Sequence, residues 1–257
     1  MLIDTHVHLN NPKLYEDLDY YVDKAKQNKV EYMFVVGYSH ETNQRAIAIA
    51  ERYDFIYAIV GYHPTEAKDI TRKDFEVLEN LLHHKKVIGI GETGLDFYWD
   101  KEFQNAQIEV FEKHIELSKK YQKPLVIHMR DATDKTYQVL KKHAPVKGVM
   151  HCYSGSSEMA PLFIDLGLHI SLGGPVTFKN ARVPKEVAKI VPLDYLLIET
   201  DAPYLAPHPF RGKQNDSSLL PYIAEAIASI KKVSFDTIAE KTSKNALRLF
   251  RLKEENL

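Results

Sequence analysis

The 257-residue chain has little of several features that define whole classes of protein. Its single cysteine, Cys152, has no partner for a disulfide within the chain, which suits a reducing cytoplasm better than a secreted scaffold. No apolar run approaches the ~18 residues of a membrane-spanning helix. The amino-terminal residues form neither a basic leader nor a long apolar segment, so secretion is not expected. We therefore predict a cytoplasmic protein without a membrane partner.

The chain also has no marked excess of positive or negative charge. The 34 Lys and Arg residues nearly balance the 35 Asp and Glu residues, which gives a formal net charge of −1. Such a chain has no overall basic field that would attract nucleic acid non-specifically. It is still compatible with an enzyme that holds one strand end, because such a pocket needs only a few local cations. Hydrophobic residues make up 44% of the chain, as is typical of a globular protein with a large core.

Segments with the patterns of strands and helices alternate along the chain. Apolar runs typical of strands cover residues 2–5, 31–36, 55–60, 87–91, 124–127, 148–150, 169–172 and 195–200. Helical spacing of apolar residues predicts helices at about 14–28, 41–53, 102–121, 134–143, 158–166, 219–231 and 235–250, with a short polar tail after the last one. Thr71 and Asp74 can cap one more helix, whose buried face would be Phe75, Leu78 and Leu82.

This alternation predicts the α/β class and one domain. Eight strand-to-helix units favour a single (β/α)₈ TIM barrel of the metal-dependent hydrolase type over residues 1–257, a length typical of that fold. No linker or low-complexity stretch indicates a second domain. An open, doubly wound sheet is the structural alternative.

Residues that bind metal ions recur where the strands end. A single histidine is most often a surface or core residue, but ligand-type residues in phase with the strands need another explanation. The carboxyl ends of parallel barrel strands surround one active site, so residues in this phase point to one metal centre. The predicted ligands are His6, His8, Glu92, His128, His151 and Asp201.

The first two ligands lie two residues apart, so on a strand both side chains point to the same face. An exposed pair on a polar face is the alternative for His6 and His8, but the neighbouring residues are mostly apolar. By the same alternation Asp4 shares their side, where its carboxylate can orient a ligand histidine from behind.

The carboxylates have more specific expected roles. A buried Glu92 without a partner would be costly, so it needs an ion pair or a metal, and we favour a bridge between two cations. Glu199 and Asp201 share one face of the last strand. We assign Asp201 to the metal and to accepting a proton, with Glu199 behind it.

Four imidazoles and two carboxylates suit two divalent ions: Zn²⁺, Mn²⁺, Co²⁺, Ni²⁺ or Mg²⁺, among which the sequence does not choose. Two such ions can activate a water molecule and stabilise charge on the attacking and leaving oxygens, so hydrolysis is the expected reaction. A covalent nucleophile is not favoured, because Cys152 is out of phase with His151 and Ser154 lacks the flanking glycines of a nucleophile elbow.

With these residues in place, the chain resembles the TatD family of metal-dependent deoxyribonucleases, within the amidohydrolase-like barrels. The resemblance covers nearly the whole chain. It is carried by the ordered segments 4–9, 60–64, 89–96, 127–130, 151–155, 199–207 and 211–215. It implies a divalent-metal site built from the six predicted ligands and hydrolysis of DNA from the 3′ end. Independently, Glu92 argues against the barrel hydrolases that bridge their metals with a carboxylated lysine at this position.

One departure from the family pattern is local. The family often follows Arg-Gly-Lys-x-Asn with an acidic residue and proline, whereas here Asp216 precedes Ser217 and Ser218. A serine can also cap the next helix, so the departure concerns loop detail and not the chemistry.

Residues around the metal ligands are candidates for binding the substrate. His63 follows a strand and can act in catalysis, bind a phosphate or position the leaving group, or it can simply belong to a structural His-Pro turn. Arg130, Arg211 and Lys213 offer cations for phosphate or form ordinary surface salt bridges. Tyr153, on the loop after His151, is assigned to the substrate as well.

Three aromatic residues, Phe97, Tyr98 and Trp99, follow the Glu92 segment. They can stack bases at a strand end, or they can pack as a lid over the barrel mouth, which we favour for at least two of the three.

The leading hypothesis is therefore a deoxyribonuclease that acts on single-stranded or frayed DNA ends, with no obligate protein partner. A phosphomonoesterase, or an esterase for a substrate such as misacylated tRNA, would use the same metals on another bond. A metal-bearing module without catalysis is the non-enzymatic alternative. The Glu92-x-Gly94-x-Asp96 segment and the Arg211-Gly212-Lys213 loop favour the nuclease.

Overall fold

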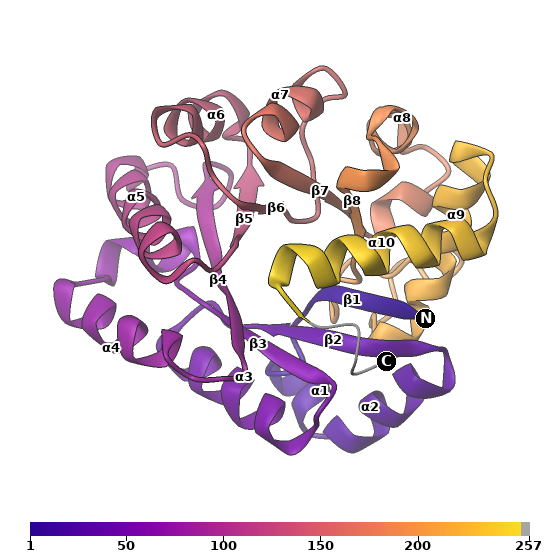
Figure 1. The fold of residues 1–257 in the computed structure, drawn as a ribbon, viewed down its shortest axis with the longest axis horizontal. Coiled ribbons are helices and arrows are strands. Elements are labelled where there is room, and N and C mark those ends of the chain that lie inside the picture. The colour runs from indigo at the N-terminus through magenta and orange to yellow at the C-terminus, as the bar shows by residue number, and fades with distance from the viewer. Residues whose placement is uncertain (253–257) are drawn as a thin grey trace.

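The computed structural model, which describes residues 1–252, is an eight-stranded parallel barrel (Figure 1). The strands are hydrogen-bonded to one another in chain order, from β1 to β8. The strands are β1 (Leu2–Val7), β2 (Val30–Val36), β3 (Ile56–Val60), β4 (Val87–Asp96), β5 (Leu125–Arg130), β6 (Gly148–Met150), β7 (Leu168–Leu172) and β8 (Leu196–Ile198). The predicted barrel is thus confirmed. The polar tail expected after the last helix falls largely at residues 253–257, outside the described part of the chain.

The first and last strands meet, which nearly closes the barrel. Thr5 Oγ1 donates to the carbonyl of Ile198 at 2.9 Å, and the amide of Asp201 donates to the carbonyl of His6 at 2.9 Å. The open doubly wound sheet is wrong, because such a sheet would leave these two strands at separate edges.

Helices surround the barrel between the strands. They are α1 (Pro12–Tyr15), α2 (Leu18–Gln27), α3 (His40–Arg52), α4 (Arg72–Leu82), α5 (Gln104–Tyr121), α6 (Thr133–Lys142), α7 (Met159–Asp165), α8 (Arg182–Ile190), α9 (Leu220–Lys231) and α10 (Phe235–Phe250). Short 3-10 turns add η1 (Pro64–Asp69), η2 (Gly174–Thr177), η3 (Leu193–Tyr195) and η4 (Ser217–Leu219). In the described residues no helix is both long enough and apolar enough to cross a membrane.

Two helical predictions differ from the structure. The first helix, expected at 14–28, is divided into α1 and α2. The sequence interpretation places no helix at α8, whose third residue is Pro184. Proline is tolerated there because a helix's first turn leaves its amide groups without intrahelical partners. The capping box of Thr71 and Asp74 at the start of α4 is confirmed.

The end of the barrel opposite the strand exits is filled by apolar side chains. Inward-facing Ile3, Phe34 and Leu197 cluster with Phe250 of α10, and the rings of Phe34 and Phe250 meet edge to face at 4.8 Å. Figure 1 shows α10 lying across β1 and β8, which it contacts. This sealed end leaves the carboxyl ends of the strands as the open face of the barrel.

Candidate metal centre

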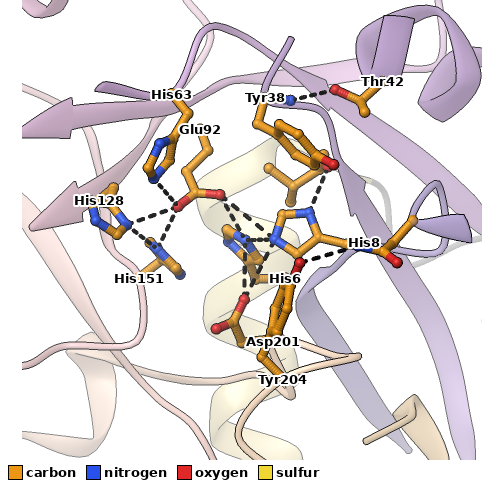
Figure 2. A network of polar contacts seen from close by, with 12 residues as sticks. His6, His8, Tyr38, Thr42, His63, Glu92, His128, His151, Asp201 and Tyr204 are labelled. Atoms are coloured by element: carbon orange, nitrogen blue, oxygen red, sulfur yellow. Dashed lines mark hydrogen bonds and ion pairs between the residues drawn. The ribbon is translucent and has the colours of Figure 1, made fainter. Parts of the chain in front are cut away.

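All six predicted ligands converge at the carboxyl ends of the strands, around the carboxylate of Glu92 (Figure 2). Close approach of the backbone positions this residue: a Cβ at the preceding Gly91 would lie 2.5 Å from the carbonyl oxygen of Val126. Only glycine fits there. The predicted strand ends at residue 91, just before Glu92, but β4 continues to Asp96 after a register shift between Ile90 and Thr93.

One oxygen of Glu92 faces what we call the Oε2 side, formed by His6, His8 and Asp201. Glu92 Oε2 lies 3.5 Å from His6 Nε2 and 3.6 Å from His8 Nε2. Asp201 Oδ1 lies 3.8 Å from the first of these nitrogens and 3.4 Å from the second. The two imidazoles of His6-x-His8 therefore share one face, as predicted from their spacing.

The other oxygen faces the Oε1 side, formed by His63, His128 and His151. Glu92 Oε1 lies 2.9 Å from His128 Nδ1, 3.0 Å from His151 Nε2 and 3.5 Å from His63 Nε2. Candidate ligand groups occur on both sides of this carboxylate. The arrangement is the one expected of a carboxylate that bridges two cations.

The outer ring nitrogens identify the tautomer in which these imidazoles are held. His8 Nδ1 lies 2.9 Å from the carbonyl oxygen of Val36, which can only accept a hydrogen bond, so this nitrogen carries the proton. When neutral, His8 therefore directs an unprotonated Nε2 towards Glu92.

The same reasoning applies on the Oε1 side. His151 Nδ1 lies 3.1 Å from Glu199 Oε1, and His128 Nε2 lies 3.0 Å from Asp96 Oδ2. Both outer nitrogens donate to carboxylates, and both inner nitrogens face Glu92. A lone pair and an anionic oxygen about 3 Å apart repel each other unless a proton or a metal ion lies between them. This donor set therefore fits divalent metal ions.

His63 is oriented the other way round, with its protonated nitrogen towards the site. Its Nδ1 accepts the amide of Thr65 at 3.2 Å, so in the neutral ring Nε2 carries the proton and points to the cavity beside Glu92. Burial, with a further contribution from His128, lowers the pKa of His63 to about 3, which keeps the ring neutral. His63 is thus equipped to donate a hydrogen bond in the site.

Burial and opposing charges together set the protonation of the cluster. Burial lowers the pKa of His6, and His151 lowers it further. Burial would raise the pKa of Glu92, but its interactions with the imidazoles of His151 and His128 outweigh this effect and hold that pKa well below the usual range. Burial also acts to raise the pKa of Asp201, and its interaction with His8 more than offsets this. Both carboxylates therefore stay anionic.

No lysine or arginine of the described residues neutralises this negative charge. Among residues 1–252, no lysine or arginine forms an ion pair with Glu92, Asp201 or Glu199. One buried oxygen, Glu199 Oε2, and the buried Nδ1 of His6 also have no hydrogen-bond partner. A cation at the centre would supply the missing positive charge.

Asp96 lies behind the predicted ligands and supports one of them. The sequence interpretation did not include it among the site residues. Its carboxylate is buried and holds His128, as described above. The signal was present, because Glu92 and Asp96 have the even spacing of residues on one strand face. The apolar run that predicts this strand ends at residue 91, so Asp96 lies outside the predicted strand.

The two predicted supporting acids lie in different places. Glu199 accepts from His151, as a residue behind the ligands should. Asp4 instead accepts hydrogen bonds from the amide and hydroxyl of Thr200 and from the hydroxyl of Ser217. Alternation does not carry over from Asp4 to the histidines, because the register of β1 shifts between residues 4 and 7. Asp4 thus anchors the segment before Asp201, and within residues 1–252 it forms no hydrogen bond with an imidazole ring.

Two adjoining cavities open above the metal centre. One, of about 530 Å³, is lined by Glu92, Asp201, His63 and Trp99, among others. The second, of about 360 Å³, extends over the loop after β6, where Tyr153 lies. Both reach His128, His151, Asp201 and Arg130.

The predicted substrate residues are distributed unevenly around these cavities. Arg130 lines both, and Tyr153 lines the smaller one with its hydroxyl donating to the carbonyl of Ser156. Arg211 stacks on Phe178, with its guanidinium carbon 4.6 Å from the ring centre, and lines neither cavity. Lys213 lines a separate surface hollow. Their role in binding substrate stays a prediction.

An eight-stranded barrel with imidazoles and carboxylates gathered at the strand exits has the architecture of a metal-dependent enzyme. The sequence matches the model of the TatD related DNase family over residues 3–251. The chain therefore belongs to the TatD family, and it is a metal-dependent hydrolase.

Individual relatives agree with this assignment. The uncharacterized metal-dependent hydrolase YabD of Bacillus subtilis (strain 168) is 48% identical over 254 residues, which cover 98% of this chain and 100% of YabD. YcfH of Escherichia coli (strain K12), also described as an uncharacterized metal-dependent hydrolase, is 36% identical, with 100% of this chain and 98% of YcfH covered. The crystal structure of YjjV, a TatD homologue from Escherichia coli K12, superposes with a TM-score of 0.93 at 31% identity, covering 98% of each chain.

Proposed function

We propose that this protein is a deoxyribonuclease that uses two divalent ions to hydrolyse phosphodiester bonds at the 3′ end of DNA. One observation carries the proposal: the two oxygens of Glu92 face two separate donor sets, of which one contains His6 and His8 and the other His128 and His151. The name of the matching family model supports DNA as the substrate.

Two bound ions would supply an activated water and stabilise negative charge on the attacking and leaving oxygens. His6, His8 and Asp201 would hold one ion, His128 and His151 the other, and Glu92 both.

The protein's own groups have distinct tasks in such a reaction. Asp201 remains ionised, and its side chain is 14% exposed against 6% for Glu92, so it is the acid better placed to take a proton from a substrate-side water. His63 would donate the Nε2 proton in a hydrogen bond to a phosphate oxygen or to the leaving oxygen. Arg130 at the rim offers a guanidinium to a neighbouring phosphate.

The test is a comparison of substrates with the purified protein in Mg²⁺, Mn²⁺ or Zn²⁺. Single-stranded DNA, duplex DNA, RNA and a phosphomonoester are assayed in parallel, each with and without chelator. We expect metal-dependent cleavage of DNA, with a 5′-labelled strand shortening stepwise from its 3′ end.

Glu92→Gln serves as the inactive variant, and Glu31→Gln, at an exposed position where β2 begins, serves as its matched control. Absence of metal-dependent phosphodiester cleavage would contradict the proposal. Turnover of only the phosphomonoester or of a carboxylic ester would assign the site to that bond instead, and absence of all turnover with metal bound would indicate a non-catalytic module.

A further inference from the structure

Two large aromatic side chains stand exposed beside the metal centre. After β4 the chain turns outward through Phe97, Tyr98 and Trp99, and only Phe97 packs against the core. Tyr98 is 50% exposed and Trp99 67% exposed. A packed lid formed by at least two of these residues, which we had favoured, is therefore wrong. Exposed aromatic surface at the rim of a cavity indicates a site for a ligand.

The two rings and Arg130 form one cluster. The guanidinium carbon of Arg130 lies 4.1 Å from the ring centre of Tyr98 and 5.3 Å from that of Trp99, and the two rings meet edge to face at 4.8 Å. The carbonyl of Arg130 also accepts the amide of Phe97 at 2.9 Å. Within residues 1–252 the Arg130 side chain forms no ion pair with a carboxylate, so its charge is available to an anion.

This cluster borders the cavity that holds the metal ligands. Trp99 and Arg130 line the same 530 Å³ cavity as Glu92, His63 and Asp201. A substrate with its reacting phosphate above Glu92 would therefore carry its adjoining group over the rings.

Asp96 connects the cluster to the metal centre. Its Oδ1 accepts the amides of Tyr98 at 2.9 Å and of Trp99 at 2.8 Å, while its Oδ2 holds His128. A single buried carboxylate thus fixes both a metal ligand and the backbone that presents the rings. This shared support keeps the rings at a constant position relative to the reacting phosphate.

We propose that Tyr98, Trp99 and Arg130 form a subsite on which an unpaired nucleobase stacks next to the scissile phosphodiester. The subsite rests on the proposed nuclease function and names the feature of the substrate that is read. Stacking tolerates any base, because every base has a flat π-face, but it requires that the base be free of its partner strand. The protein should therefore favour single-stranded or frayed ends for a structural reason.

The chain's single tryptophan makes the subsite directly observable, because Trp99 is the only source of tryptophan fluorescence. The Mg²⁺-loaded protein is titrated with a phosphorothioate oligothymidylate, which resists cleavage, and with an abasic strand of the same length and charge. Saturable quenching by the first strand alone is expected. Equal quenching by both strands, or by neither, would overturn the proposal.

Substitutions give a second, independent measurement. Trp99→Ala should raise KM for single-stranded DNA about tenfold with little change in kcat, because it removes the aromatic face on which the base stacks. Trp99→Phe should restore most of the loss. Tyr195→Ala, which removes a partly exposed ring just before β8, at the opposite end of the barrel, should leave KM unchanged.

An unchanged KM in Trp99→Ala would overturn the subsite. The two proposals can fail separately. Cleavage of DNA with no base-dependent quenching would reject the subsite alone, whereas base-dependent quenching without cleavage of any polynucleotide would reject the nuclease function and keep the subsite.

Discussion

The two sides of Glu92 use similar donors but support them differently. On the Oε1 side, His128 and His151 each donate their outer proton to a carboxylate, Asp96 in one case and Glu199 in the other. A carboxylate behind an imidazole fixes its orientation and makes the inner nitrogen a stronger donor to a metal.

The Oε2 side has no such acid behind its imidazoles. His8 donates to the carbonyl of Val36, and the Nδ1 of His6 has no hydrogen-bond partner among the residues that the structure describes. Its negative charge comes from Asp201 within the donor set itself. One ion position would therefore depend on a carboxylate within its own donor set, and the other on carboxylates that hold its histidines from behind. Substitutions on the two sides should have different effects.

Glu92→Gln should have the largest effect, because the residue serves both sides. We expect activity to fall on the order of a thousandfold, since two ions can supply several kcal/mol of transition-state stabilisation. Metal analysis of the purified variant should show both ions depleted. Retention of both ions at the wild-type level would show that Glu92 does not hold them.

Asp201→Asn should act on the Oε2 side. We predict an activity loss of at least about a hundredfold, with the ion of the Oε1 side retained. Metal content and kcat are measured on the same preparation. Activity within a few-fold of wild type would mean that Asp201 neither holds an ion nor accepts a proton.

Asp96→Asn and Glu199→Gln should act on the Oε1 side alone. Each removes the anion behind one imidazole, which typically weakens metal binding by roughly ten- to a hundredfold. Titration of the chelated protein with Zn²⁺ should show one weakened site and one unchanged site. Equal weakening of both sites would show that the two sides are not independent.

His114 is a buried imidazole outside the site, and its hydrogen-bond partners are backbone groups. It shows what burial does to the pKa of a histidine in this protein. His114 donates from Nδ1 to the carbonyl of Val110 and accepts the amide of Tyr62 at Nε2, and burial lowers its pKa from 6.5 to about 4. Between these two values the unfolded chain binds a proton that the folded protein does not. Stability is therefore fully present above pH 6.5 and declines as the pH falls through this window.

The expected contribution of His114 is roughly 3 kcal/mol across that window, with no effect on activity at neutral pH. Denaturant unfolding of wild type and His114→Gln at several pH values measures it. The variant should show a shallower decline, and identical slopes would refute the assignment.

Much of this site could be predicted from sequence because its ligands follow strands. The apolar runs before Glu92, His128 and His151 end near the same face of the barrel, so chain order alone indicated their convergence. The alternation of side chains along a strand gave a wrong prediction for Asp4. A register shift in β1 directs its carboxylate towards Thr200 and not towards a ligand histidine.

Other features depend on tertiary contacts that no local pattern records. The role of Asp96 required knowing that β4 continues past Glu92. The tautomers of His8 and His63 depend on Val36 and Thr65, which meet them only in the folded chain or its turn. The exposure of Trp99 likewise follows from how the loop leaves the barrel.

The most direct test of the account is the anomalous diffraction of a Mn²⁺-loaded crystal. We expect two peaks, one on each side of Glu92, roughly 3.5–4 Å apart as in other two-metal sites. One peak should be bound by His6, His8 and Asp201 and the other by His128 and His151. A single peak, or peaks that do not share Glu92, would contradict the account.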